Sequence, residues 1–166
     1  WYYGTLARTA WLDSGMRTLP LAATYRYNLV NHEEGIDDVE TDTPAAINAY
    51  ITSSEIDLQS GGKFGFVWRV LPDMTFEGST IDAPNATITL NPLQNPGSGY
   101  NSPLSEGGNS AGTVTRSATA PVEAFTGQVN IRIRGRQMSM KIESTDTGVQ
   151  WQLGHPRIDV RADGGR

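Results

Sequence analysis

Apolar and polar residues alternate along the last quarter of the chain, residues 128–166. Val129, Ile131 and Ile133 occupy odd positions, and the residues between them are polar. This period of two is the pattern of a strand that buries one face, because successive side chains of a strand point to opposite sides. The pattern therefore predicts a strand that begins near residue 129 and carries arginines on its polar side.

The alternation changes phase after Gly135. Met138, Met140 and Ile142 occupy even positions, so one residue has been inserted between 134 and 137. Gly135 is the natural site for a bulge or bend, because glycine accepts positive φ while the flanking stretches keep their apolar side chains on one core. We predict one long strand that is bent at Gly135, with further strands beside it at residues 151–154 and 157–161.

Short extended runs separated by turn residues fill most of the remaining chain. Runs of β-branched and aromatic residues predict strands, and clusters of Gly, Pro, Asn and Asp predict the turns between them. The turn signals lie at residues 60–62, 71–73, 95–97 and 106–109. The further predicted strands are residues 25–30, 49–58, 64–71, 86–90 and 112–117.

Helical periodicity is scarce. Residues 43–50 begin with Thr-Pro and predict either a short helix or a turn that leads into a strand. Residues 91–112 contain few large apolar groups and predict a long surface loop. The expected fold class is all-β, with antiparallel sheets, long loops and little helix, as part of a β-propeller or a β-sandwich-like element.

The length and composition fit one β-rich unit. A chain of 166 residues can bury about two-thirds of its unfolded surface. It has no cysteine, no signal-peptide pattern and no apolar run near the ~20 residues that cross a bilayer, so we expect a soluble protein without stable membrane insertion. Because the sequence starts at Trp1 within an apparent strand, we expect the C-terminal fragment of a longer chain. Residues 1–45 would end an upstream blade or sheet, and residues 46–166 would form a terminal β element.

Charge is distributed unevenly along the chain. Residues 1–115 carry five basic and thirteen acidic side chains, whereas residues 116–166 carry eight basic and five acidic ones. This division is either ordinary solvated surface or a sign that the two parts face different partners.

Six carboxylates lie within residues 33–42, directly after His32. A calcium loop is one interpretation, because hard cations prefer closely spaced oxygen ligands, but the glycine and glutamate positions of an EF-hand are missing. A solvated acidic loop is the default interpretation, and no metal site is expected. The carboxylates are those of Glu33, Glu34, Asp37, Asp38, Glu40 and Asp42.

Evidence for catalysis is weak. His32 beside Glu33 would point away from it in a strand, and no nucleophile elbow, zinc-binding helix, phosphate loop or dinucleotide-binding glycine pattern occurs. A carboxylate pair of a glycan-cleaving enzyme remains an alternative, because eighteen acidic residues allow many pairs. We expect a protein that is not an enzyme and binds no cofactor.

Aromatic residues admit two interpretations. The rings near Trp1 and Trp11, and those of Phe64, Phe66 and Trp68, could stack on sugars, which makes a carbohydrate-binding receptor module the main alternative function. The commoner role of such rings is core packing. The three rings from 64 to 68 share one parity and Val67 lies on the other side, so we expect a strand that is covered on both faces.

Arginines on the predicted bent strand could bind nucleic acid phosphates or acidic protein surface. In an acidic protein the second is the better expectation, with carboxylates supplied by the first part of the chain or by a neighbouring subunit. The candidate residues of a subunit interface are Arg132, Arg134, Arg136, Trp151, His155 and Arg157.

Several short segments, in order, resemble the C-terminal region of tail nozzle proteins of short-tailed bacteriophages, also called packaged-DNA stabilisation or tail-hub proteins. The resemblance covers most of the chain and is strongest in the closing segment. The segments are WxxG at 1–4, RTAWxD at 8–13, HExG at 32–35, VLPD at 70–73, RGRQM at 134–138, WxLG at 151–154 and RxDVR at 157–161.

This resemblance implies a structural virion protein that contains a β-propeller and is assembled in the host cytoplasm. Copies of the subunit would form a ring below the portal and adaptor, contact other tail proteins, continue the DNA channel and help to retain packaged DNA without sequence-specific binding. The arginines would then contact an acidic neighbour, and the carboxylates of residues 33–42 would either face the channel or be solvated.

Overall fold

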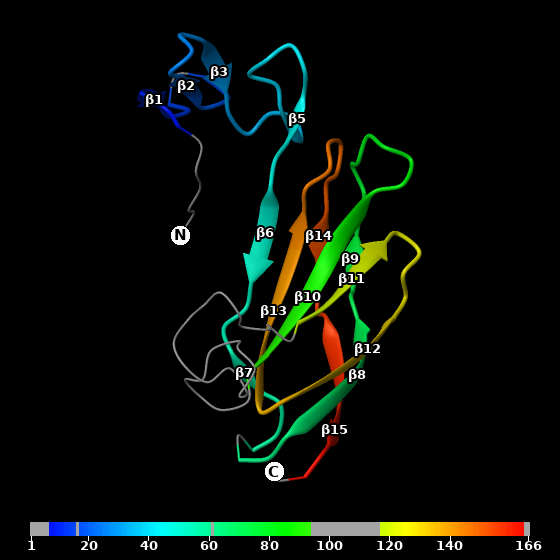
Figure 1. Cartoon of the computed structure of the whole chain (residues 1–166). Coiled ribbons are helices and arrows are strands. Elements are labelled where there is room, and N and C mark those ends of the chain that lie inside the picture. Colours follow the sequence, from blue (N-terminus) through cyan, green and yellow to red (C-terminus); the bar gives the residue numbers. More distant parts are fainter. Residues whose placement is uncertain (1–6, 16, 61, 94–116, 165–166) are drawn as a thin grey trace, which may run out of the picture.

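The computed structural model of the chain describes residues 7–15, 17–60, 62–93 and 117–164. These residues form an all-β structure of several antiparallel sheets (Figure 1), which confirms the predicted fold class. Within these ranges no helix is present that could cross a membrane.

The larger sheet is built around β10 (Asn85–Leu93) and β13 (Gln137–Ser144), which pair along most of their lengths. β11 (Ala118–Glu123) pairs with the other side of β10, and β6 (Ala49–Thr52) pairs with the other side of β13. The short β7 (Ile56–Asp57) extends the β6 side along the first residues of β13.

The second sheet has three strands with β8 (Gly65–Leu71) in the centre. β12 (Val129–Gly135) pairs with one edge of β8, and β15 (Arg157–Ala162) pairs with the other. Both pairings are antiparallel. The prediction that residues 157–161 form a strand is confirmed, but β8 separates that strand from β12.

The two sheets bury one common core, as in a β-sandwich. The alternation of each strand explains which residues enter this core, because every second side chain faces the opposite sheet. Its buried members from the larger sheet are Ala86, Ile88, Leu90, Val122, Met138 and Ile142, and those from the second sheet are Val67, Val70, Val129, Ile131 and Ile133.

Gly135 marks a crossing between the sheets and not a bend within one strand. β12 ends at Gly135, β13 begins at Gln137, and the two strands belong to different sheets. The predicted phase change is confirmed, because both strands face the same core. The prediction of a single bent strand is wrong, since the inserted residue, Arg136, carries the chain from one sheet to the other.

The reason for a glycine at this crossing is close packing. Gly135 does not have positive φ. A Cβ atom at Gly135 would lie 2.8 Å from the backbone oxygen of Gln137, 3.1 Å from that of Leu93 and 3.0 Å from the Pro92 Cβ. The backbone therefore passes too near its neighbours to accommodate a side chain.

Several other expectations have clear outcomes. Residues 43–50 contain no helix, because β5 (Ala45–Ala46) and the start of β6 occupy them, as the extended alternative predicted.

The predicted loop at 91–112 begins too early, since β10 continues through Leu93. The rest of that loop, the segment 112–116 and the WxxG segment lie outside the described residues. The predicted strand at 151–154 is reduced to β14 (Gln152–Leu153), which pairs with β9 (Met74–Thr75).

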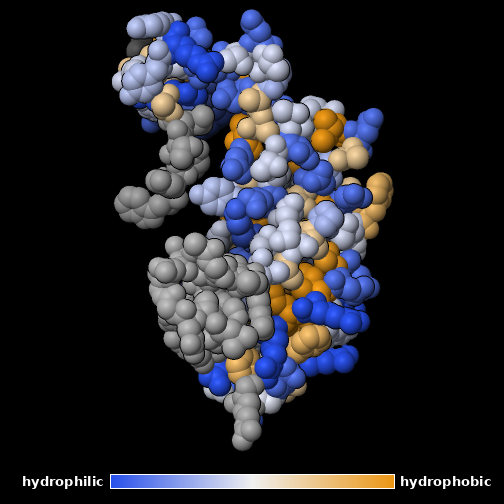
Figure 2. Space-filling view, viewed as in Figure 1, coloured by the Kyte–Doolittle hydropathy of each residue, from blue (hydrophilic) through white to orange (hydrophobic). Residues whose placement is uncertain are grey.

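The first part of the chain forms two small sheets beyond one end of the sandwich (Figure 1). β2 (Leu21–Ala23) pairs with β1 (Ala10–Leu12) and β3 (Leu29–Asn31), so the strand predicted at 25–30 is mostly a turn. β4 (Asp37–Asp38) pairs with β5. Figure 2 shows that hydrophilic residues cover much of the surface over these small sheets.

Candidate functional site: an arginine-rich sheet face

The outer surface of the β12–β8–β15 sheet carries most of the basic side chains of the sandwich. Because the apolar residues of these strands face the core, the residues between them point away from it. We call this surface the arginine face; its members are Phe66, Trp68, Arg69, Asn130, Arg132, Arg134, Arg157, Asp159 and Arg161.

A bulge in the middle of β8 shapes this face. The register of both neighbouring strands shifts beside Trp68, between Asn130 and Ile133 on β12 and between Asp159 and Val160 on β15. A bulge places two consecutive side chains on one side of a strand. It explains why Trp68 and Arg69 are both half-buried on the outer surface while Val67 and Val70 are buried in the core.

Two guanidinium groups lie over the Trp68 ring. The Cζ atoms of Arg69 and Arg161 lie 4.6 and 4.9 Å from the centre of its ring, within the range of cation–π attraction. Arg69 also forms an ion pair with Asp159 on the neighbouring strand, at 2.5 Å. The aromatic ring and the carboxylate together fix the direction of the Arg69 side chain.

Phe64 performs the same role at the end of the sheet. Its buried ring lies 4.1 Å from the Arg134 Cζ atom and 4.6 Å from that of Arg136. Arg134 also forms an ion pair with Asp163. Stacking on Phe64 fixes the position of both guanidinium groups.

Two exposed arginines of this face have no polar partner among the described residues. Neither the Arg132 nor the Arg157 side chain forms a hydrogen bond or an ion pair there. Arg132 and Arg161 flank a shallow depression whose other lining residues are Phe66, Trp68, Asn130 and Ile131. A depression with a guanidinium group on either side of aromatic rings is suited to carboxylates, which guanidinium groups bind through two parallel hydrogen bonds.

The structure brings together only some of the candidate interface residues. Arg132, Arg134 and Arg157 lie on the arginine face, and Arg136 lies at its edge over Phe64. Trp151 packs against the core and donates its indole N–H to the Ser144 Oγ at 3.1 Å. His155 is an exposed residue whose backbone N–H binds the Asp73 carboxylate.

The prediction for the aromatic strand was incomplete. Phe66 and Trp68 share a face, as expected, but Val67 is the residue that enters the core. Two arginines, Arg69 and Arg161, lie over the Trp68 ring on the outer surface. Arg69 and Arg161 were not among the candidates, although the alternation of residues 157–161 already placed Arg161 on the same side as Arg157.

The carboxylates of residues 33–42 surround the small β4–β5 sheet. Asp37 accepts hydrogen bonds from the backbone N–H of Gly148 at 2.8 and 3.0 Å, and Asp38 accepts one from the backbone N–H of Glu40 at 3.0 Å. The Glu40 carboxylate is half-buried and forms an ion pair with Arg8, and those of Glu33, Glu34 and Asp42 are exposed. We call the segment 33–42 the acidic segment.

Asp37 therefore has a structural role, because its bonds to Gly148 attach the first part of the chain to the sandwich. The calcium interpretation gains no support, since the described residues contain no group of three or more His, Asp or Glu side chains placed to hold a metal ion.

Arg8 joins His32 to the acidic segment. Its Nε donates to the His32 Nε2 at 3.0 Å, and its Nη1 lies 3.3 Å from the Glu40 Oε2. Burial lowers the pKa of His32 from its usual value of 6.5, and the positive charge of Arg8 lowers it further. The His32 ring also lies 4.6 Å from the Trp11 ring. A proton on the His32 Nε2 would remove the acceptor of the hydrogen bond from Arg8.

We expect acid to loosen this part of the protein. Because the folded-state pKa of His32 is lowered, its contribution to stability is complete above pH 6.5 and is lost as the pH falls through the folded-state pKa. The pKa can be measured from the imidazole resonances by NMR. Replacing Arg8 with glutamine should raise the pKa of His32; an unchanged value would contradict the assigned role of Arg8.

Comparison with known proteins finds no matching family and no matching curated protein.

Proposed function

We propose that this chain is a structural component of a short-tailed phage tail, where it forms part of the nozzle ring that continues the DNA channel and helps to retain packaged DNA. The sequence resemblance supports this assignment. In this proposal the protein has no catalytic role, DNA passes through the ring without sequence-specific binding, and the ring contacts the tail adaptor and copies of itself in the virion.

The observation that carries the proposal is the separation of two charged surfaces on one chain. The arginine face lies on the sandwich, and the exposed carboxylates Glu33, Glu34 and Asp42 lie in the acidic segment of the first part. Arg132 and Arg157 lack polar partners among the described residues. A surface of oriented arginines is therefore available to an acidic partner.

A ring is the assembly that uses two such surfaces in every subunit. In a ring each subunit presents one surface to the subunit before it and a different surface to the subunit after it. Complementary charge then fixes the direction of assembly and disfavours contact between identical surfaces. We propose that the arginine face of one subunit contacts the acidic segment of the next.

Replacing Arg132 with glutamate tests this contact. Arg132 is exposed and has no polar contact with a described residue, so the variant should fold normally. Reversing one charge at a desolvated interface should weaken association by about tenfold or more, because losing one partner of a buried charge pair costs about 2–5 kcal/mol. Sedimentation velocity and electron microscopy of the purified protein would measure the size and symmetry of the assembly.

Arg26→Glu is the matched control, because Arg26 is an exposed arginine in the turn before β3. A chain that combines Arg132→Glu with Glu33→Lys and Asp42→Lys has reversed charges on both the arginine face and the acidic segment. Because opposite charges face each other again, this chain should recover assembly. Rings that form equally well with Arg132→Glu and with the control would disprove the proposed contact.

A further inference from the structure

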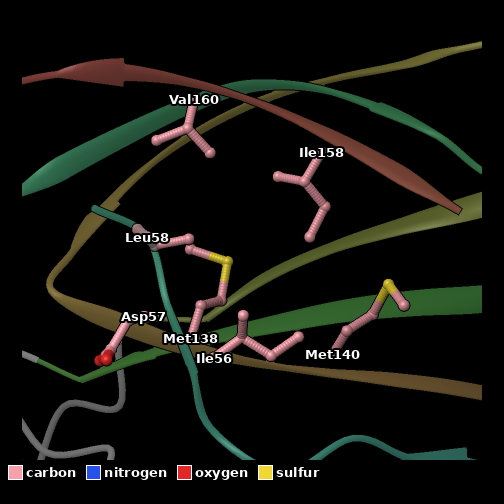
Figure 3. Close-up of a pocket in the computed structure, with 7 residues that line it drawn as sticks. All are labelled: Ile56, Asp57, Leu58, Met138, Met140, Ile158 and Val160. Carbon is pink, nitrogen blue, oxygen red and sulfur yellow. The ribbon is translucent and has the colours of Figure 1, made fainter. Parts of the chain in front are cut away.

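One side of the sandwich is open to solvent between its two sheets. The opening is an apolar groove with the β7 region and β13 on one side and β15 on the other (Figure 3). In Figure 3, Ile158 and Val160 extend from β15 toward the two methionines of β13. The groove is lined by Ile56, Asp57, Leu58, Met138, Met140, Ile158 and Val160.

The groove has an apolar floor and a polar rim. Met138 is buried, whereas Ile158 and Val160 are only half-buried and Ile56 remains 48% exposed. Asp57 is the only charged lining residue in the described structure, and its carboxylate accepts a hydrogen bond from the Gln137 side chain. Apolar area at the groove would therefore be removed from water if another segment covered it.

β15 is an edge strand beside this groove. In the described structure it pairs with β8 on one side, and no strand pairs with its other side. The backbone N–H and C=O groups along a free edge are a template for another extended segment. A segment that pairs with β15 would direct every second side chain into the groove, over Ile158 and Val160.

The outward side chains of β15 define which segment fits. Arg157 and Arg161 lie four residues apart on the arginine face, and neither has an ion-pair partner among the described residues. Asp159 lies between them and is already paired with Arg69. Opposite charges on directly facing residues of paired strands attract, and like charges repel.

We propose that the free edge of β15 binds an extended segment of another protein with the pattern acidic, apolar, neutral polar, apolar, acidic. The two apolar residues enter the groove, the two acidic residues face Arg157 and Arg161, and the neutral residue faces Asp159. This is recognition by strand addition, in which the backbone supplies affinity and alternate side chains supply specificity. It uses the groove and does not rest on the proposed function.

The size of the groove favours this occupant over a small ligand. Its volume is about 170 Å³. Pockets for small organic ligands usually measure about 300–1,000 Å³. A groove of this size beside a free strand edge is better suited to two apolar side chains.

The test uses the full chain and the synthetic peptide acetyl-Thr-Glu-Val-Thr-Val-Glu-Thr-amide. Isothermal titration should show saturable binding, and hydrogen exchange of the β15 amides should slow when the peptide is bound. Three control peptides replace both valines with serine, replace both glutamates with lysine, or carry N-methyl groups on alternate backbone nitrogens. Each control should bind at least about fivefold more weakly, because each removes one of the three proposed sources of affinity.

Two protein variants locate the site. Arg157→Glu should weaken binding of the glutamate peptide by about fivefold or more and improve binding of the lysine peptide. Ile56→Lys should weaken the binding of both peptides, because it places a charge in the groove. Val39→Lys is the control, since Val39 is a 69% exposed residue of the acidic segment outside the groove.

Equal binding of the N-methylated peptide, or no slowing of exchange in β15, would overturn strand addition. Self-association of the chain that Ile56→Lys abolishes, together with no peptide binding, would show that a second copy occupies the groove and would overturn the proposed partner. Assembly of rings by the Ile56→Lys variant would leave the proposed function intact whatever the peptide result, because Ile56 lies in the groove and not on the arginine face.

Discussion

Replacing Ile88 with alanine is expected to lower the free energy of unfolding by about 2–5 kcal/mol, the usual range for removing a large aliphatic side chain from a core. Ile88 is fully buried in β10, the strand that lies between β11 and β13. It pairs with Ala120 on one side and Ile142 on the other. The cavity would lie in the centre of the larger sheet, where three strands limit how far the structure can relax.

Urea unfolding followed by tryptophan fluorescence would measure this loss. Ile51→Ala is the matched control, because Ile51 belongs to the same sheet but is 51% exposed. The control should change stability by much less. Equal losses in the two variants would contradict the position of the core, since a surface isoleucine leaves no cavity when truncated.

Replacing Gly135 with valine is expected to destabilise the protein by about 1–3 kcal/mol or more, because a new side chain must be forced into a closely packed site. Two of the nearest atoms are backbone oxygens, those of Gln137 and Leu93, which cannot move aside without disturbing strand pairing. The Leu93 oxygen also accepts the Arg136 N–H at 2.9 Å, so the clash falls on a bond that holds the crossing.

Gly127→Val serves as the control for this substitution. Gly127 precedes β12 in an exposed turn, and no atom lies within 4 Å of the position of its Cβ. Thermal unfolding of the two variants should therefore separate the effect of the crossing from the effect of a β-branched residue in general. A Gly135→Val protein as stable as the control would mean that the crossing can shift to admit a side chain.

The sequence predicted the faces of the strands better than their connections. The alternation around Ile131 and the phase change after Gly135 correctly identified core-facing residues on both sides of the glycine. A phase change is produced equally by a bulge within a strand and by a crossing between two facing sheets. Only the partners of β12 and β13 distinguish these cases, and those partners are distant in the sequence.

The sequence was also insufficient to decide which side of β8 faces the core. Phe66 and Trp68 have larger side chains with more apolar surface than Val67, and this favoured them as core residues. Val67 and Val70 are instead the core residues of β8, and the guanidinium groups of Arg69 and Arg161 lie over the Trp68 ring. Cation–π stacking depends on strand order, which period-two patterns do not reveal.

Contacts that join distant segments were the least predictable part of the candidate site. The acidic segment was correctly identified as a cluster of carboxylates. The sequence could not show which of these carboxylates are exposed and which are bonded within the protein. Asp37 binds the backbone of Gly148, 111 residues away. Nothing in the local sequence separates this carboxylate from its exposed neighbours.

The place of β8 in the chain has a consequence for synthesis. This strand is the centre of its sheet, yet both of its partners, β12 and β15, follow it in the sequence. At about 5–20 residues per second, roughly 5–20 s pass between the synthesis of β8 and that of β15. Throughout this interval a strand with Val67 and Val70 on one side and aromatic rings on the other has at least one unpaired edge. The nascent chain is therefore most exposed to wrong pairing before its last strand emerges.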